Sequence, residues 1–172
     1  MKKWLVIASA LGTLTACDGG SSPTAPTAPP ANIAASYAAT VTASSTCSAS
    51  LPIEAQALQF LANITQTGAT VQVQLVAHVP GVPEVTFSGT VSGQTVNFPS
   101  FSFTQTMGRG AALAASGNAN VAANGLSITG TLNGTYQTSS GASCNAANHQ
   151  IQLVKLCLQP TPNGTAMLPC QQ

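Results

Sequence analysis

The chain has 172 residues, among them four Lys or Arg and three Asp or Glu. A nucleic-acid-binding protein would show a basic patch, and electrostatic attachment to anionic lipid needs clustered Lys and Arg, so the composition excludes both classes. Because charge is so scarce, Ser, Thr, Asn and Gln must wet the surface, which is typical of an exported β-protein.

The first 16 residues have the order of a secretory signal peptide. Lys2 and Lys3 form a positive start, an apolar run covers residues 4–14, and small residues lead to Cys17. The run is too short for a transmembrane helix, which needs about 20 apolar residues.

The segment 14–17, Leu-Thr-Ala-Cys, resembles the lipobox of bacterial lipoproteins, in which two small or hydroxylated residues separate Leu from Cys. The resemblance covers the leader alone, and an ordinary signal peptide is the alternative. It implies that residues 1–16 are removed and that Cys17 carries acyl chains such as palmitate, which anchor the protein to a membrane of the bacterial envelope. Asp18 resembles the signal for inner-membrane retention in enteric bacteria, although the choice of membrane stays open.

Residues 17–32 are expected to form a linker that carries the lipid at its first residue. The linker is rich in Gly, Ser and Pro and has no large apolar residue to bury, so it is flexible and partly extended. At roughly 3 Å per residue it would hold a domain up to about 40 Å from the membrane. Residues 33–172 have the length of one ordinary domain.

This domain alternates apolar and polar residues with a period of two, the pattern of half-buried strands. The alternation is clearest over 126–136, and no helical periodicity of useful length appears. Pro99 predicts a long loop after the fifth strand, and a phase break at Val154 indicates a bulge or a strand end in the eighth. The eight expected strands cover 37–43, 58–64, 70–77, 85–91, 96–98, 117–123, 126–136 and 148–158.

Eight sequential strands joined by short turns predict an antiparallel up-and-down meander. A meander with one polar face must bury the other, and closure into a barrel does this while removing exposed edges. We therefore expect an all-β fold that is a closed or nearly closed barrel, with a β-sandwich as the alternative. The architecture resembles that of lipocalins, without any lipocalin sequence motif.

Four cysteines follow the leader: Cys47, Cys144, Cys157 and Cys170. An even number in an exported chain implies disulfides, for which three pairings exist. The loops after strands one and seven lie at the same end of such a barrel, which favours Cys47–Cys144 and leaves Cys157–Cys170. The tight turns and the linker then lie at the opposite end. No Cys-x-x-Cys spacing occurs, so neither a metal nor a cofactor is expected.

Phe98, Phe101, Phe103 and Met107 form an apolar cluster around Pro99. In a small barrel that holds one ligand, such a cluster would line or cap the cavity. The alternative is that these side chains fill the core as a hydrophobic lid.

Glu54, His78, Glu84 and His149 are expected at or near the end that carries the long loops, as is Arg109. General acid–base chemistry needs such groups within hydrogen-bond reach of one another, but exposed loops also hold charges simply because they are solvated. No catalytic residue is assigned. We expect a non-enzymatic envelope lipoprotein that has a structural or interaction role or binds a small apolar ligand in the barrel. An envelope enzyme using the loop Glu and His residues is the alternative.

Overall fold

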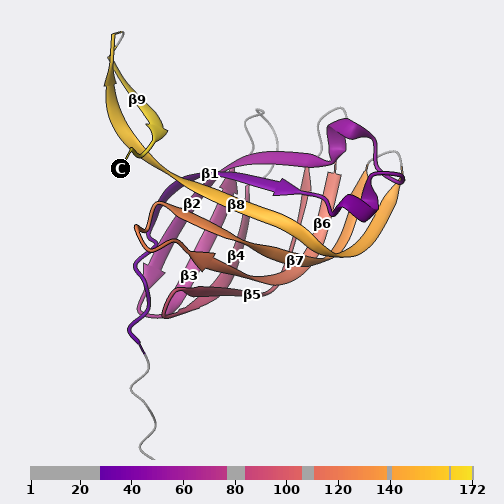
Figure 1. Ribbon diagram of the computed structural model, residues 1–172, viewed down its shortest axis with the longest axis horizontal. Helices are drawn as coiled ribbons and strands as arrows, with labels where there is room; N and C mark the ends of the chain where they lie inside the picture. The colour runs from indigo at the N-terminus through magenta and orange to yellow at the C-terminus, as the bar shows by residue number, and fades with distance from the viewer. Residues whose placement is uncertain (1–27, 77–83, 106–110, 139–140, 163, 172) are drawn as a thin grey trace, which may run out of the picture.

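The chain folds into a closed antiparallel barrel with a hairpin attached (Figure 1). The computed structural model describes residues 28–76, 84–105, 111–138, 141–162 and 164–171. Nine strands pair in chain order, and β1 also pairs with β8, which closes the first eight into a barrel. This confirms the expected all-β barrel and excludes the sandwich. The strands are β1 (Ala35–Thr42), β2 (Ala57–Thr67), β3 (Thr70–Val76), β4 (Val85–Ser92), β5 (Thr95–Gln105), β6 (Ala111–Val121), β7 (Ser127–Thr138), β8 (Ser143–Thr161) and β9 (Gly164–Pro169).

Some of the residues that the sequence singles out lie outside the described ranges. These are the leader with Cys17, and His78, Met107 and Arg109. The lipid anchor therefore stays a prediction.

As expected, apolar and polar residues alternate along the strands, and the apolar ones form the core. In β3, Val71, Val73 and Leu75 are buried inside the barrel, whereas Gln72 is exposed. Gly68 lies between β2 and β3 with φ of 60°, a left-handed conformation that glycine adopts without strain. The strand order therefore follows from short turns and a period of two.

The N-terminal segment seals the tight-turn end of the barrel. The backbone N–H of Ala31 donates to the carbonyl of Gly93, in the β4–β5 turn, at 2.7 Å. The side chain of Gln66 accepts from Ile33 N–H at 2.8 Å and donates to the Ala31 carbonyl at 3.0 Å. Ile33 is buried, and its carbonyl accepts from the Tyr37 hydroxyl at 2.9 Å. The chain enters at the expected end, and Ala31 already packs on the barrel, two residues before the expected boundary.

The opposite end is covered by two short 3-10 helices, η1 (Ser45–Cys47) and η2 (Ile53–Ala55). Cys47 of η1, Ala55 of η2 and Leu51 between the two helices are buried. Between the two ends, large side chains of the described residues are buried in the interior. They include Tyr37, Phe98, Leu113, Leu132 and Tyr136.

The expected long loop after the fifth strand is wrong. β5 runs from Thr95 to Gln105 and pairs with β6, which begins at Ala111 rather than at residue 117. The register shifts between Phe98 and Phe101, which marks a β-bulge around Pro99. Proline has no N–H to give to a ladder, and a bulge accommodates it without ending the strand. The bulge also hides the alternation that would have revealed one long strand.

A ninth strand was not expected. β8 pairs with β1 as far as Lys155 and then continues outside the barrel, where it pairs with β9 alone (Figure 1). The phase break at Val154 therefore marks the place where β8 leaves the barrel and not the end of the strand. The Cys157–Cys170 disulfide ties this hairpin at its base, with 5.0 Å between the Cα atoms.

No helix in the described part of the chain is long and apolar enough to span a bilayer.

Candidate functional site

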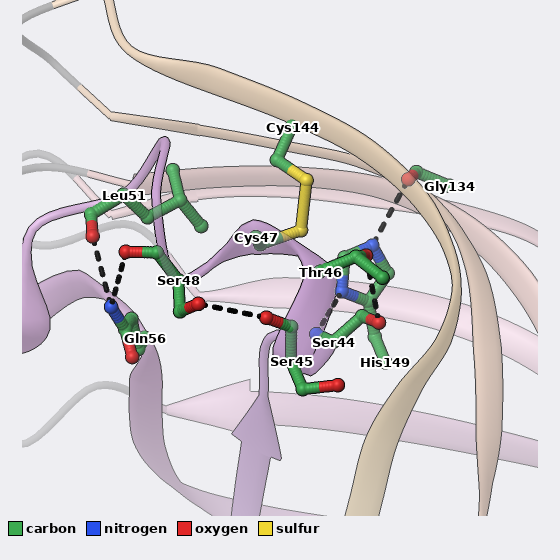
Figure 2. The surroundings of a disulfide bond; sticks show 10 residues. All are labelled: Ser44, Ser45, Thr46, Cys47, Ser48, Leu51, Gln56, Gly134, Cys144 and His149. Carbon is green, nitrogen blue, oxygen red and sulfur yellow. Dashed lines mark hydrogen bonds between the residues drawn. A yellow bond between two sulfur atoms is a disulfide. The ribbon is translucent and has the colours of Figure 1, made fainter.

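The most elaborate part of the molecule is the barrel end that carries the Cys47–Cys144 disulfide (Figure 2). After β1 the chain turns through Ser44 into η1, which lies across the start of β8. The two Cα atoms are 5.6 Å apart and the sulfur atoms are bonded at 2.07 Å. This separation is normal for a disulfide, and the pairing is the one that strand parity predicts.

His149 locks the same region from inside. Its ring is fully buried, and Ser44 N–H donates to its Nδ1 atom at 3.0 Å. Because Nδ1 accepts, Nε2 carries the proton and donates to the carbonyl of Gly134 on β7, also at 3.0 Å. One side chain on β8 therefore fastens both the segment before η1 and the neighbouring strand (Figure 2).

A β-bulge turns His149 into the barrel. Leu132 pairs with His149 and Gly134 pairs with Ala146, so two residues of β8 face one residue of β7. The second of the two, Asn148, has φ of 66°, which Asn tolerates better than most residues. Bulges of this kind re-aim side chains, often next to functional sites. Before the bulge the even-numbered residues of β8 face the barrel interior, and after it the odd-numbered residues do.

These contacts correct the expectation for the loop acids and histidines. His149 lies in the eighth strand, as expected, but its ring is buried rather than solvated, and it shares its phase with Ile151 and Leu153 in the core. Glu84 is exposed just before β4, where Gln74 donates a hydrogen bond to it. The side chain of Glu54 lies outside the described part, as does His78. The structure thus brings no described carboxylate to His149.

We expect His149→Phe to lower the free energy of unfolding by about 2–4 kcal/mol. The substitution keeps a ring in place but leaves Ser44 N–H and the Gly134 carbonyl without a partner, and each unmet buried group costs about 1–3 kcal/mol. Urea unfolding followed by far-ultraviolet circular dichroism measures the change. Gln152→Ala, at an exposed position on the same strand, is the control, and an equal loss in both variants would contradict the bridging role.

Tyr136 lies beside this histidine, with 5.8 Å between the ring centroids. Its hydroxyl is buried and finds no hydrogen-bond partner among the described residues. Burial raises the pKa of Tyr136 above its ordinary value, and burial does the same for the pKa of Tyr37. The neutral phenol is therefore the form that the fold requires.

Replacing Tyr136 by Phe is expected to leave stability at neutral pH unchanged or to raise it by up to about 1 kcal/mol, because the unmet hydroxyl is removed. Since the folded-state pKa is raised, the unfolded chain ionises first, and stability falls as pH rises above about 10. The variant should lose less stability than the parent between pH 9 and 11, where Tyr37 still contributes. Parallel alkaline curves for the two proteins would contradict this.

Outside the barrel wall, next to η1, the surface forms a hollow of about 840 Å³. Residues of segment 42–48, Gln56 and the start of β8 line it, and none of the lining side chains carries a charge. The hydroxyl of Ser45 and the side-chain amides of Asn145 and Asn148 have no hydrogen-bond partner within the described part of the chain. The hollow thus offers free, neutral donors and acceptors on a wall that is held by the disulfide and by His149.

The aromatic cluster does not border this hollow. Phe98 and Phe101 are buried, and the Phe101 ring stacks on Phe87 at 4.4 Å while Phe98 meets Phe87 edge-on at 5.7 Å. Both residues are packed in the core, because the bulge in β5 keeps both facing inward, and Phe101 also borders a second surface hollow of about 530 Å³ beside Pro99. The side chain of Phe103, like Met107, lies outside the described part.

Within the described residues, no group of three or more His, Cys, Asp or Glu side chains is placed to hold a metal ion. Protein-family models, curated proteins and solved structures were compared with the chain. None matches.

Proposed function

We propose that this chain is a lipid-anchored lipoprotein of the bacterial envelope that acts without catalysis, by binding a neutral, hydroxyl-rich partner such as an envelope glycan in the hollow beside η1. The observation that carries the proposal is that the N-terminal segment and the hollow lie at opposite ends of the barrel. The N-terminal segment enters at the tight-turn end, through the Ala31–Gly93 contact, whereas the hollow lies at the η1 end. A lipid on Cys17 would hold the hollow away from the membrane.

The chemistry of the lining supports the choice of partner. Hydroxyl and carboxamide groups can both donate and accept hydrogen bonds, which suits the hydroxyls of a saccharide. An uncharged lining gives no attraction to phosphate or to a carboxylate. Among the described residues, large side chains such as Tyr37, Phe98 and Tyr136 are buried in the barrel interior, which favours a surface site over an apolar ligand inside.

Mass spectrometry of the membrane-extracted protein tests the anchor. We expect an N-terminal peptide that begins at Cys17 and carries two or three acyl chains. An unmodified residue 17 would contradict the anchor, and it would leave the proposed binding site to be judged by itself.

Titration of the protein with a panel of neutral oligosaccharides, followed by amide NMR shifts, tests the site. Asn148→Gly removes the side chain while keeping a residue that adopts positive φ easily, and Asn145→Ala removes the second amide. We expect each to weaken binding by about tenfold, equivalent to about 1.4 kcal/mol. Gln152→Ala, outside the hollow, should bind as the parent does. Binding that is insensitive to both asparagines, or no binding to any saccharide, would refute the site.

A further inference from the structure

The β8–β9 hairpin projects from the end of the barrel where the N-terminal segment enters (Figure 1), and it carries exposed apolar side chains. Beyond Lys155, β8 has no barrel partner and pairs only with β9. Six residues of β8 project in this way, which at about 3.3 Å per residue makes an arm of about 20 Å. The Cys157–Cys170 disulfide fixes the base of the arm.

One face of the arm is apolar. Leu158 pairs with Met167 and Leu156 pairs with Pro169, and side chains of paired residues lie on the same face. Leu158 is 73% exposed and Met167 is 46% exposed, while Leu168 on the other face is 40% exposed. Leu158 and Met167 are therefore exposed side by side on one face, and contiguous exposed apolar surface is a feature of interaction sites.

The composition of the arm indicates which kind of partner could cover its apolar face. No charged residue occurs from 156 to 172, so burying the arm in an apolar medium removes no charge from water. Pro160 and Pro169 lie one in each strand, and proline cannot donate to a ladder, so the edges are poor templates for pairing with a second copy. These features fit a lipid surface better than strand addition.

The length of the linker is compatible with contact between the arm and a lipid surface. From Cys17 to Ala31 there are 14 residues. A flexible chain of that length spans about 20 Å on average, and a fully extended one about 43 Å. The arm and the N-terminal segment leave this end of the barrel in opposite directions in the view of Figure 1. A linker that reaches about 43 Å when extended would still let the lipid and the arm meet one bilayer.

We propose that the apolar face of the β8–β9 hairpin inserts into the interfacial region of the bilayer that holds the lipid on Cys17. The inference rests on the proposed anchor. It adds a second membrane contact, which orients the barrel so that the η1 end faces away from the bilayer. Two or three acyl chains on Cys17 would already give stable attachment, so the contribution of the arm would be to fix the orientation of the barrel.

Single-tryptophan probes in the lipidated chain test the proposal. The sequence has one Trp, in the leader, so the mature chain provides no background. Leu158→Trp places a probe on the apolar face, and Ile53→Trp places one at the η1 end, where Ile53 is 83% exposed. Both proteins are reconstituted into phosphatidylcholine vesicles with bromine on the upper part of the acyl chains, and flotation verifies attachment.

We expect a blue-shifted emission for the Trp at 158 and quenching of about twofold, because interfacial segments sit about 5–10 Å into the headgroup–acyl boundary. The Trp at 53 should show neither effect, which controls for the general affinity of Trp for interfaces. Gln159→Trp, on the opposite face of the same strand, should be quenched less than the Trp at 158.

Each other outcome is informative. Vesicles that float with the protein while the Trp at 158 stays unquenched would overturn the membrane contact and leave the anchor intact. A blue shift without quenching, together with chemical cross-linking of two copies, would assign the face to a dimer and would also overturn it. Equal quenching at 158 and 159 would overturn the assignment to this face. Protein that does not float contradicts the anchor itself.

Discussion

Replacing Cys47 and Cys144 together by alanine is expected to lower the free energy of unfolding by about 4–5 kcal/mol. The bond joins residues 97 positions apart, and in the chain-entropy model a closed loop of about 100 residues stabilises a fold by about 4.7 kcal/mol. Domains of this kind are stable by only about 5–15 kcal/mol in total. Urea unfolding of the oxidised protein, followed by circular dichroism, measures the loss. The double substitution avoids leaving one reactive thiol.

The second disulfide provides the matched control. Cys157 and Cys170 are 13 positions apart and tie a hairpin that lies outside the barrel. Removing them should change the unfolding of the barrel by about 1 kcal/mol or less, because the arm can open locally while the barrel stays folded. Hydrogen exchange should still show loss of protection in β9. Equal losses from the two double variants would contradict a separate, locally opening arm.

The Cys47–Cys144 disulfide shows which features of the fold can be predicted from the sequence. An unbroken period of two allows only one face to be buried, so the barrel and its strand order follow from side-chain patterning and short turns. Once the order is known, the ends of strands one and seven lie at one rim. The pairing of Cys47 with Cys144 then needs no further information, and the structure has it.

Features that interrupt the alternation of apolar and polar residues were not predicted from the sequence. The bulge between Phe98 and Phe101 conceals the continuation of β5, and the bulge at Asn148 changes the phase of β8. β9 is short and carries Pro169, and proline within a run normally argues against a strand. It forms because the Cys157–Cys170 bond and the preceding strand hold it in place.

The candidate site was predictable only in part. His149 shares its phase with Ile151 and Leu153, and this phase indicates a buried position for the ring. The hollow could not be foreseen, because it depends on η1 folding across β8. The run of Ser and Thr residues does not by itself determine the path of η1. The disulfide and the hydrogen bond from Ser44 N–H to His149 determine it.

Gly130→Ala is expected to lower the free energy of unfolding by about 3 kcal/mol or more, at the upper end of what overpacking costs. A Cβ atom at this position would lie 2.1 Å from the carbonyl oxygen of Asn118 and 2.4 Å from the Cα atom of Ala119 on β6. Both are backbone atoms, so no side chain can turn aside to make room. The protein is expected to accumulate poorly or to unfold at a markedly lower denaturant concentration.

The control is Gly68→Ala, in the β2–β3 turn. Gly68 has φ of 60°, and a Cβ atom there would meet nothing within 4 Å beyond its chain neighbours, so alanine costs only the backbone strain of about 1–2 kcal/mol. A loss at Gly130 no greater than that at Gly68 would contradict the role of close approach. The seam between β6 and β7 repeats the feature, since a Cβ at Gly117 or Gly134 would also lie 2.1 Å from a backbone oxygen of the facing strand. Three such glycines on one strand pair let the sheet bend tightly, and that curvature brings β8 round to β1.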